Sequence, residues 1–224
     1  MTRCGRVAAS CVLLTTGCVT LGPRSAEVQR GLSTSLQASS GTSVGAPAGW
    51  FFSLDCEANC DTKTIGADVG LTYGWPNALG GRPASLGVGT SGLFPYAEGY
   101  VQLATGRVPF GVGARFGLPL WSWRQHQLGA RVDVPLGGDD TRLLLDPGLF
   151  VYEGNAPNGE NGGHIVAFTQ AVGVVFRGAV ADFTPAVTLV AGHARHESSA
   201  FPAEAGRTTF ATVSMGVTFH RRRK

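Results

Sequence analysis

The sequence predicts an all-β fold, an antiparallel up-and-down transmembrane β-barrel of about ten strands, with eight strands as the alternative. First, every second residue from Val108 to Leu120 is apolar, and the residues between them are glycine, proline or arginine. A period of two gives a strand one apolar face and one polar or small face. Second, the pattern recurs along the chain. Third, short and long connections alternate between its copies, which is typical of membrane barrels.

The composition supports one large β domain. The chain has 224 residues, 43% of them hydrophobic and 15% charged, and many of its 33 glycines alternate with valine, leucine and phenylalanine. Such alternation favours packed β structure over disorder. The formal net charge of +3 depends on basic residues near the two ends, namely Arg3, Arg6 and residues 221–224. No basic face indicates a nucleic-acid partner.

Residues 1–17 are predicted to be a signal peptide. Arg3 and Arg6 precede a weakly apolar stretch that is too short to span a bilayer as a helix. The motif LTTGC, which ends at Cys18, resembles the lipobox of bacterial lipoproteins, in which the cysteine is acylated and becomes the first residue. This resemblance implies lipidation of Cys18 and, because Val19 rather than aspartate follows, sorting to the outer membrane. An ordinary cleaved signal peptide is the alternative.

Two further cysteines would meet an oxidising compartment after export. Cys56 and Cys60 are close enough in sequence to close a small disulfide loop. Such a pair is not a zinc site by itself, because four ligands are needed and no histidine lies nearby in the sequence. We therefore expect a disulfide between Cys56 and Cys60, and no metal.

Residues 18–30 are expected to be a polar tether, residues 31–220 the barrel and residues 221–224 a basic tail. The predicted strands are, in order, residues 31–39, 50–55, 66–75, 84–104, 108–118, 127–136, 142–152, 164–177, 180–192 and 207–219. The alternation is sharpest in the third and last of these segments, where bulky apolar residues alternate with glycine, serine, threonine or aspartate. The fourth segment is ambiguous, because it could also be two short strands broken at Pro95, or a loop and one strand. Counted as one strand, it gives a total of ten.

The connections between the predicted strands set the orientation. Short turns lie near residues 105–107, 137–141 and 177–180, and longer polar loops lie at residues 119–126, 153–163 and 193–206. With a periplasmic C-terminus, all three longer loops fall outside the cell.

Two features argue against a closed barrel. Residues 56–65 would be a long connection on the side of the short turns. Pro147 and Pro185 lie within predicted strands, and proline cannot donate a hydrogen bond to a ladder. An open sheet or a sandwich would accommodate these prolines more easily.

Eight charged residues fall on the polar face of the predicted strands: Asp68, Glu98, Arg115, Arg131, Asp133, Asp146, Arg177 and Asp182. In a narrow barrel these groups must pair with one another or with water, because unpaired buried charge is costly. Both signs are present. We therefore predict a salt-bridged, mostly plugged lumen rather than a wide selective pore.

Two motifs suggest other functions on weaker grounds. Residues 87–92 match the pattern GxGxxG, but Pro95 follows and no helical pattern appears, so small residues on a strand are the better interpretation. Residues 193–199 combine two histidines, a glutamate and two serines. A histidine, a glutamate and a serine can support acyl transfer only when a third group orients the base. For residues 193–199 we favour a solvated loop.

Taken together, residues 31–219 resemble bacterial outer-membrane β-barrel proteins of the small, non-porin kind. Members of this class end on an aromatic residue, and Phe219 has the right phase, although His220 and the basic tail follow. The resemblance implies a bacterial outer-membrane location, with membrane lipid and the barrel-assembly machinery as partners. It also implies an envelope-structural, adhesive or limited-permeation role, without enzyme activity, catalytic residues or cofactors. The alternatives are a lipid-anchored soluble β-barrel or sandwich that binds an apolar ligand in the periplasm, and a surface hydrolase acting on envelope lipids.

Overall fold

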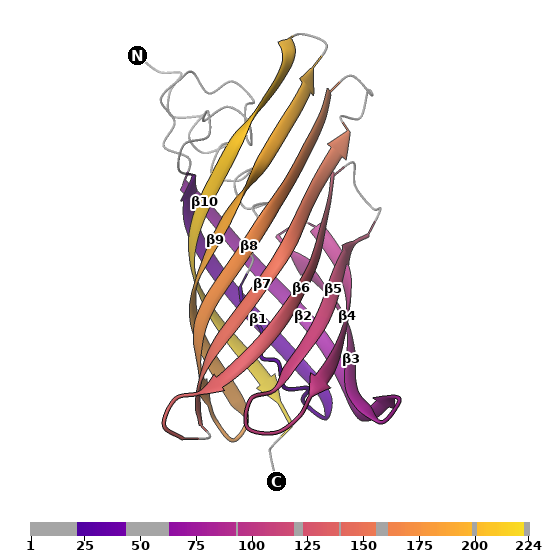
Figure 1. The fold of residues 1–224 in the computed structure, drawn as a ribbon, viewed down its shortest axis with the longest axis vertical. Coiled ribbons are helices and arrows are strands. Elements are labelled where there is room, and N and C mark those ends of the chain that lie inside the picture. Colours follow the sequence, from indigo (N-terminus) through magenta and orange to yellow (C-terminus); the bar gives the residue numbers. More distant parts are fainter. Residues whose placement is uncertain are drawn as a thin grey trace, which may run out of the picture.

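The chain forms a closed antiparallel barrel (Figure 1). The computed structural model describes residues 22–43, 63–92, 94–118, 123–138, 140–155, 161–198 and 201–221. Each strand pairs with its neighbours in sequence, and β1 pairs with β10 to complete the ring. The strands are β1 (Gly31–Ser43), β2 (Lys63–Leu79), β3 (Arg82–Ser91), β4 (Phe94–Ala104), β5 (Phe110–Gly117), β6 (Trp123–Pro135), β7 (Thr141–Asn155), β8 (Asn161–Arg177), β9 (Ala181–Ser198) and β10 (Phe201–His220). The predicted all-β, ten-stranded, up-and-down barrel is confirmed.

Strands extend through much of what was predicted to be longer loops: β7 ends at Asn155 and β8 begins at Asn161, and β9 ends at Ser198 and β10 begins at Phe201. The predicted loops at residues 119–126, 153–163 and 193–206 were therefore too long.

Short turns lie at the end that also holds the C-terminus (Figure 1). One of them joins Leu79 of β2 to Arg82 of β3 through Gly80 and Gly81, whose φ angles are 62° and 78°. A two-residue hairpin turn with both φ angles positive matches the twist of the flanking strands, and glycine adopts it without steric cost. Within the described residues no helix is long and apolar enough to cross a membrane.

The barrel wall has an apolar outer face and a mostly polar inner face. Outward side chains such as Phe116 and Leu128 are 58% and 60% exposed, whereas the inward Asp68 and Asp133 are 2% and 0% exposed. This separation follows from the alternation of side chains along each strand. The predicted assignment of apolar residues to the outer face is therefore correct for strands such as β5 and β10, where Val112, Phe116, Val213, Met215 and Phe219 are exposed.

Outward aromatic residues gather near the end with the short turns. Phe176 of β8 pairs with Phe183 of β9, and their rings stack with centroids 6.4 Å apart. Tyr73 and Trp75 near the end of β2 are in ring contact at 4.8 Å. Aromatic rings at such a level are typical of the girdles of membrane barrels.

Several predicted boundaries were wrong. Residues 84–104 are not one strand but two, β3 and β4, and the break lies at Gly92 rather than Pro95. The predicted strand 50–55 lies outside the described residues, so the total of ten is reached by a different count. β1 ends at Ser43 and β2 begins at Lys63, both at the end opposite the short turns. Residues 63–65 of the predicted long connection are therefore strand, and residues 56–62 lie outside the described residues.

The prolines within strands are accommodated in the closed barrel. Across the β6–β7 ladder, Gly129 pairs with Gly148 and Val132 pairs with Leu145, and the register is the same on both sides of Pro147. The positions between these pairs have no ladder partners across β6. The β8–β9 ladder is interrupted in the same way beside Pro185. Local gaps of this kind let proline omit one hydrogen bond, so the expectation that Pro147 and Pro185 favour an open sheet or sandwich was wrong.

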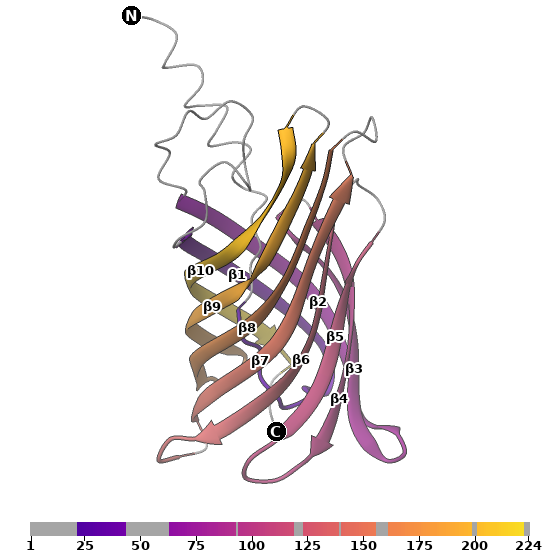
Figure 2. The ribbon, with the colours of Figure 1, turned by 45° about the horizontal axis from the view of Figure 1, so that its top comes forward.

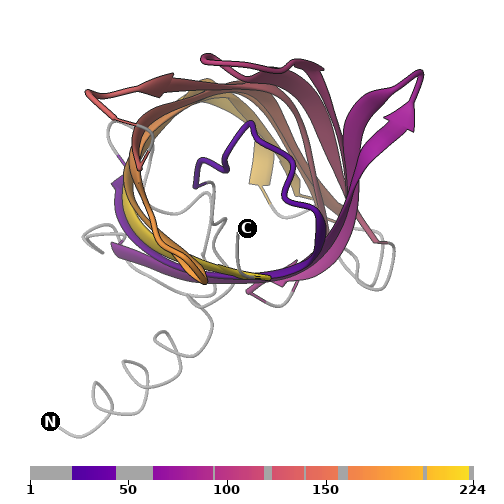
Figure 3. The same cartoon turned by 90° about the horizontal axis from the view of Figure 1, so that it is seen from below.

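Residues 22–29 lie inside the barrel. Seen from below, the chain before β1 crosses the interior of the ring (Figure 3). The tilted view in Figure 2 shows the same segment within the wall formed by the strands. Gly31 begins β1 opposite Gly74, near the end with the short turns, and the preceding residues turn back into the lumen. The described part of the expected tether is therefore a component of the barrel, and we call residues 22–29 the plug.

Candidate functional site

The candidate site is the lumen where the plug meets the wall. Arg24 of the plug inserts its guanidinium between two carboxylates of the wall. Its Nη2 lies 3.1 Å from Asp68 Oδ1, and its Nη1 contacts Glu98 Oε1. Tyr96 supports this arrangement, because its hydroxyl accepts a hydrogen bond from Arg24 Nη2 at 2.7 Å and donates one to Asp68 Oδ1 at 2.9 Å. We call Asp68, Glu98 and Tyr96 the acidic site.

Arg115 of β5 holds the same carboxylates from the wall. Its Nη1 lies 3.1 Å from Asp68 Oδ2, and its Nη2 lies 3.5 Å from Glu98 Oε2. Its guanidinium carbon also lies 4.0 Å from the centre of the Tyr96 ring, within range of a cation–π contact. Two carboxylates therefore alternate with two guanidinium groups. Buried charges are tolerated in such an arrangement because each has a partner of opposite sign.

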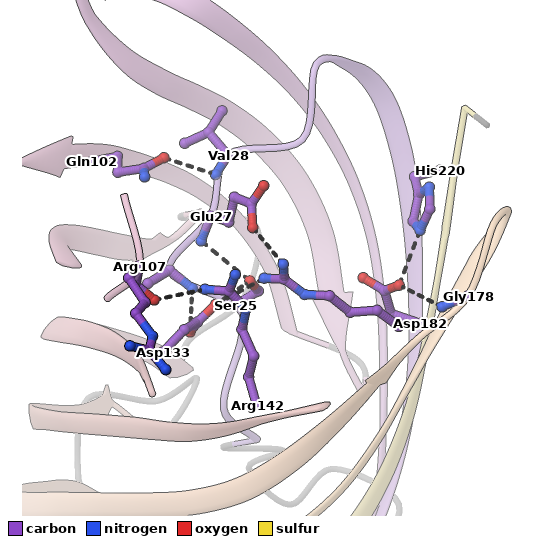
Figure 4. A network of polar contacts seen from close by, with 12 residues as sticks. Ser25, Glu27, Val28, Gln102, Arg107, Asp133, Arg142, Gly178, Asp182 and His220 are labelled. Atoms are coloured by element: carbon purple, nitrogen blue, oxygen red, sulfur yellow. Dashed lines mark hydrogen bonds and ion pairs between the residues drawn. The ribbon is translucent and has the colours of Figure 1, made fainter. Parts of the chain in front are cut away.

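A second cluster holds the middle of the plug at Asp133 of β6. The Ser25 hydroxyl donates to Asp133 Oδ2 at 2.6 Å, and the Ala26 backbone N–H donates to Asp133 Oδ1 at 2.8 Å (Figure 4). Arg177 Nη2 of β8 lies 3.4 Å from Asp133 Oδ2, and its Nη1 lies 2.7 Å from Glu27 Oε2. Asp133 therefore ties the plug to two strands that are not neighbours in the ring.

Backbone atoms of the plug bind side chains of the wall. The Tyr100 hydroxyl donates to the Ala26 carbonyl at 2.8 Å, and the Val28 N–H donates to Gln102 Oε1 at 3.1 Å. Among the described residues, no backbone–backbone hydrogen bond joins the plug to a strand. The plug is therefore docked by side chains and is not a further strand of the sheet.

Glycines of the wall make room for the plug. A Cβ atom at Gly74 of β2 would lie 2.0 Å from the Gln29 carbonyl oxygen. A Cβ at Gly173 of β8 would lie 2.9 Å from Pro23 Cγ, well inside normal contact distance. Any side chain at Gly74 would collide with plug backbone, so the glycine content of the inner face has a specific consequence here.

All eight charged residues predicted for the lumen have inward, mostly buried side chains. Besides the two clusters above, Arg131 Nε lies 3.9 Å from Asp146 Oδ2. Asp182 accepts a hydrogen bond from the Gly178 N–H at 3.3 Å, and its Oδ1 lies 3.1 Å from His220 Nε2 (Figure 4).

The sequence prediction missed the uncharged participants, such as Tyr96, Tyr100 and Gln102, and four acidic or basic ones. Arg142 and His220 lie on the inward face of β7 and β10, where the same alternation that identified Asp146 could have found them. Arg24 and Glu27 precede the first strand, and no periodicity marks them. Only the excess of carboxylates near Asp68 and Glu98 hints that a further cation is needed.

A small cavity of about 100 Å³ remains beside the plug. Its lining includes both polar residues, such as Ser35 and Gln37, and apolar ones, such as Leu36, and it borders Arg24 and Glu98. The Glu98 Oε2 atom is buried and accepts no hydrogen bond from the residues that the structure describes.

Most of the other predicted sites lie outside the described residues. Cys18, Cys56 and Cys60 are not among the described residues, so lipidation and the disulfide stay predictions. Residues 193–198, which were considered for hydrolysis and predicted to lie in a loop, are instead the last part of β9. The side chain of His193 is exposed, and the side chains of residues 194–198 are not described. Residues 87 and 89 of the GxGxxG pattern lie in β3 against Glu98 and Tyr96, as expected for small residues on an inner face. Within the described part of the chain, no group of three or more potential metal ligands occurs.

Comparison with known proteins gives likenesses of fold only. No protein-family model matches the chain, and no curated protein matches it. Among solved structures, the chain is similar to Neisserial surface protein A (NspA), with 10% identity and a TM-score of 0.40 over 87% of this chain and 99% of that one. It is also similar to the Acinetobacter baumannii outer membrane protein Omp33, with 11% identity and a TM-score of 0.27 over 88% and 100% of the two chains.

Proposed function

We propose that the chain is an integral outer-membrane β-barrel with an envelope-structural role, held closed by its own plug. The observation that carries this proposal is the reversal of the usual polarity of a soluble protein. Large apolar side chains point outward around the barrel, and ion pairs occupy the part of the interior where the plug lies, beside inward apolar residues of β7 to β9 such as Leu144 and Val175. Each apolar side chain moved from water into lipid contributes about 1.5–3 kcal/mol, so this surface favours a bilayer strongly.

The extent of the outer apolar surface argues against an aqueous location. The outward leucine, valine and phenylalanine side chains that are more than a third exposed come from nearly every strand. Soluble monomers rarely expose continuous apolar patches larger than a few hundred Å². A periplasmic barrel or sandwich that binds an apolar ligand would need its apolar residues inside, where this barrel has Asp68, Glu98 and Asp133.

The orientation and partners follow from the same proposal. The end with the short turns and the C-terminus faces the periplasm, and the opposite end of the barrel faces outward. Phe219 lies on the outer face near that end, where the barrel-assembly machinery would meet it. Acylation of Cys18 would add a lipid anchor to a barrel that already spans the membrane.

The filled lumen favours a structural or surface-displaying role over that of an open pore. Arg24, Ser25 and Ala26 occupy the interior and bind carboxylates of opposite walls. Adhesive contacts would then involve the end of the barrel that faces outward. Limited permeation is the second candidate, and the side-chain docking of the plug favours it, because the plug can leave without breaking a strand ladder.

Gel mobility tests the proposed function. We expect the purified chain in mild detergent to run as a compact species before boiling and to shift on boiling, because a closed barrel resists SDS until heated. In planar bilayers the same preparation should insert and remain closed for most of the time. A chain without a heat-dependent shift would overturn the barrel in the membrane. A steady, wide conductance from the wild-type chain would overturn the structural role.

A further inference from the structure

We propose that the acidic site of Asp68, Glu98 and Tyr96 is a binding site for guanidinium-bearing cations, which Arg24 occupies when the plug is docked and vacates when it leaves. This inference rests on the proposed function and deepens its permeation variant. It assigns the lumen a ligand class. In the plugged state, the chain's own arginine is the ligand that closes the path.

Several acceptors of the barrel wall hold the Arg24 guanidinium at once. Asp68 and Glu98 approach the two terminal nitrogens of Arg24 from different strands, β2 and β4. The Tyr96 hydroxyl accepts a third contact, and the Tyr96 ring lies 5.9 Å from the guanidinium carbon. Guanidinium is planar and donates in several directions at once, so it suits this set of acceptors better than a spherical cation does.

The barrel wall can bind a cation when the plug is absent. In the wall, Asp68 and Glu98 form ion pairs with Arg115, and Arg131, which pairs with Asp146, lines the cavity beside Glu98. Removal of Arg24 therefore leaves three carboxylates, those of Asp68, Glu98 and Asp146, against the two guanidinium groups of Arg115 and Arg131. A buried excess of negative charge is costly, and a cation that enters from solution would relieve it.

Space for a ligand already exists beside Glu98. The cavity of about 100 Å³ borders both Arg24 and Glu98. Glu98 is 8% exposed, and its Oε2 atom accepts no hydrogen bond from the described residues. Withdrawal of Arg24 would enlarge this cavity and leave Glu98 Oε1 with the Thr72 hydroxyl, 3.3 Å away, as its donor.

The plug can move out of the lumen while the barrel stays intact. The plug is bound through side chains such as those of Asp133, Tyr100 and Gln102, and the ring of strand ladders closes without it. Its departure would open the lumen to water along the inward charged side chains of strands β2 to β7. The acidic site would then lie on the path of any solute that crosses.

The test is chemical replacement of the missing side chain in the full-length protein. Arg24→Ala is reconstituted into planar bilayers with potassium chloride, and guanidinium chloride or tetramethylammonium chloride is added. We expect Arg24→Ala to conduct, with a preference for potassium over chloride. Guanidinium should block this current in a saturable way, whereas tetramethylammonium, which has no N–H donor, should not. Arg30→Ala, in the exposed residue between the plug and β1, should stay closed like the wild type.

A second substitution in the Arg24→Ala background locates the site. Glu98→Gln should weaken the guanidinium block by about tenfold or more, because it removes a charge-assisted hydrogen bond. If Arg24→Ala destabilises the barrel, Arg24→Gln removes the charge with a smaller change in volume. Every variant is first checked for its heat-dependent gel shift.

Three results would overturn the inference. Arg24→Ala could stay closed, the two added cations could act alike, or Glu98→Gln could leave the block unchanged. If the wild type lacked the heat-dependent shift, the proposed function would fail as well. If the shift were present without a specific guanidinium block, this inference alone would fail.

Discussion

Leu128 and Asp133 lie on the same strand, β6, and face opposite sides of the barrel wall. Leu128 is 60% exposed on the outer surface, and Asp133 is fully buried in the lumen. The outer surface needs only apolar side chains, because lipid makes no directional contacts with them. The lumen needs specific partners, since Asp133 binds Ser25, Ala26 and Arg177 together. The outer surface is therefore tolerant of exchange among apolar residues, and the lumen is not.

The lumen itself has two unlike sides. Strands β2 to β7 contribute most of the charges, including Asp68, Glu98, Arg115 and Asp146. At mid-height, strands β8 to β10 contribute small or uncharged residues such as Thr169 and Ser214. The charged side binds Arg24 of the plug by direct ion pairs, whereas from the other side Arg177, at the end of β8, pairs with Glu27. Substitutions on the two sides should therefore differ widely in cost, and the following predictions are ordered by that cost.

The largest effect is expected for Asp133→Ala. It leaves Arg177 buried without its wall carboxylate and removes the acceptor of two plug hydrogen bonds. Breaking a buried ion pair from one side costs about 3–5 kcal/mol. Urea unfolding in detergent micelles should show this loss. Asp140→Ala, in an exposed turn, is the matched control and should change stability little. Equal losses for the two variants would contradict the role given to Asp133.

A smaller loss is expected for Leu128→Arg on the outer surface. An arginine near the bilayer midplane costs about 2–4 kcal/mol, and one near the interface costs at most about 1 kcal/mol. The control is Leu136→Arg, because Leu136 is exposed in the turn after β6. Folding into lipid vesicles, titrated with urea, measures both. If Leu128→Arg were as stable as the control, lipid would not be the medium around the barrel.

Gly74→Ala should displace the plug without a change of charge. The new Cβ would lie 2.0 Å from the Gln29 carbonyl oxygen, and overpacking of this kind costs about 1–3 kcal/mol. Trypsin cleavage after Arg24 should then accelerate by about tenfold, because cleavage follows the undocked population. Gly216→Ala is the control, since its Cβ would lie 3.7 Å or more from its neighbours. An unchanged cleavage rate would mean that Gly74 does not seat the plug.

The smallest effect is expected for Thr169→Val on the uncharged side of the lumen. The Thr169 hydroxyl is buried and has no hydrogen-bond partner among the described residues. Replacement by a methyl group of similar size removes an unsatisfied polar atom, so stability should stay within about 1 kcal/mol or rise. Urea unfolding beside Asp133→Ala compares the two sides directly. A loss comparable to that of Asp133→Ala would remove the distinction between them.

The sequence allowed the outer surface to be predicted well, because strand parity is a local property. Val112, Phe116 and Met215 were assigned to the outer face by alternation alone. The inward charges, such as Asp68 and Arg115, followed from the opposite parity. The same rule failed at residues 84–104, because the break at Gly92 depends on the pairing of β3 with β4 and not on a proline.

The plug could not be predicted from periodicity, because its contacts are far apart in sequence and it has no regular structure. Arg24 contacts Glu98, and Ser25 contacts Asp133, although each pair is far apart in the sequence. A polar segment before the first strand is typical of a tether, and nothing local distinguishes the two outcomes. The positions of Gly74 and Gly173, which accommodate the plug, become informative only once the ring is closed.

The most direct test of the account is whether folding of the urea-unfolded chain, lacking residues 1–17, requires a bilayer. The account predicts that dilution into buffer alone gives no compact species, whereas dilution into lipid vesicles gives a barrel that shifts on gels when heated. A folded, monodisperse monomer in buffer without lipid or detergent would contradict it, because the apolar outer surface would then have to be covered by protein.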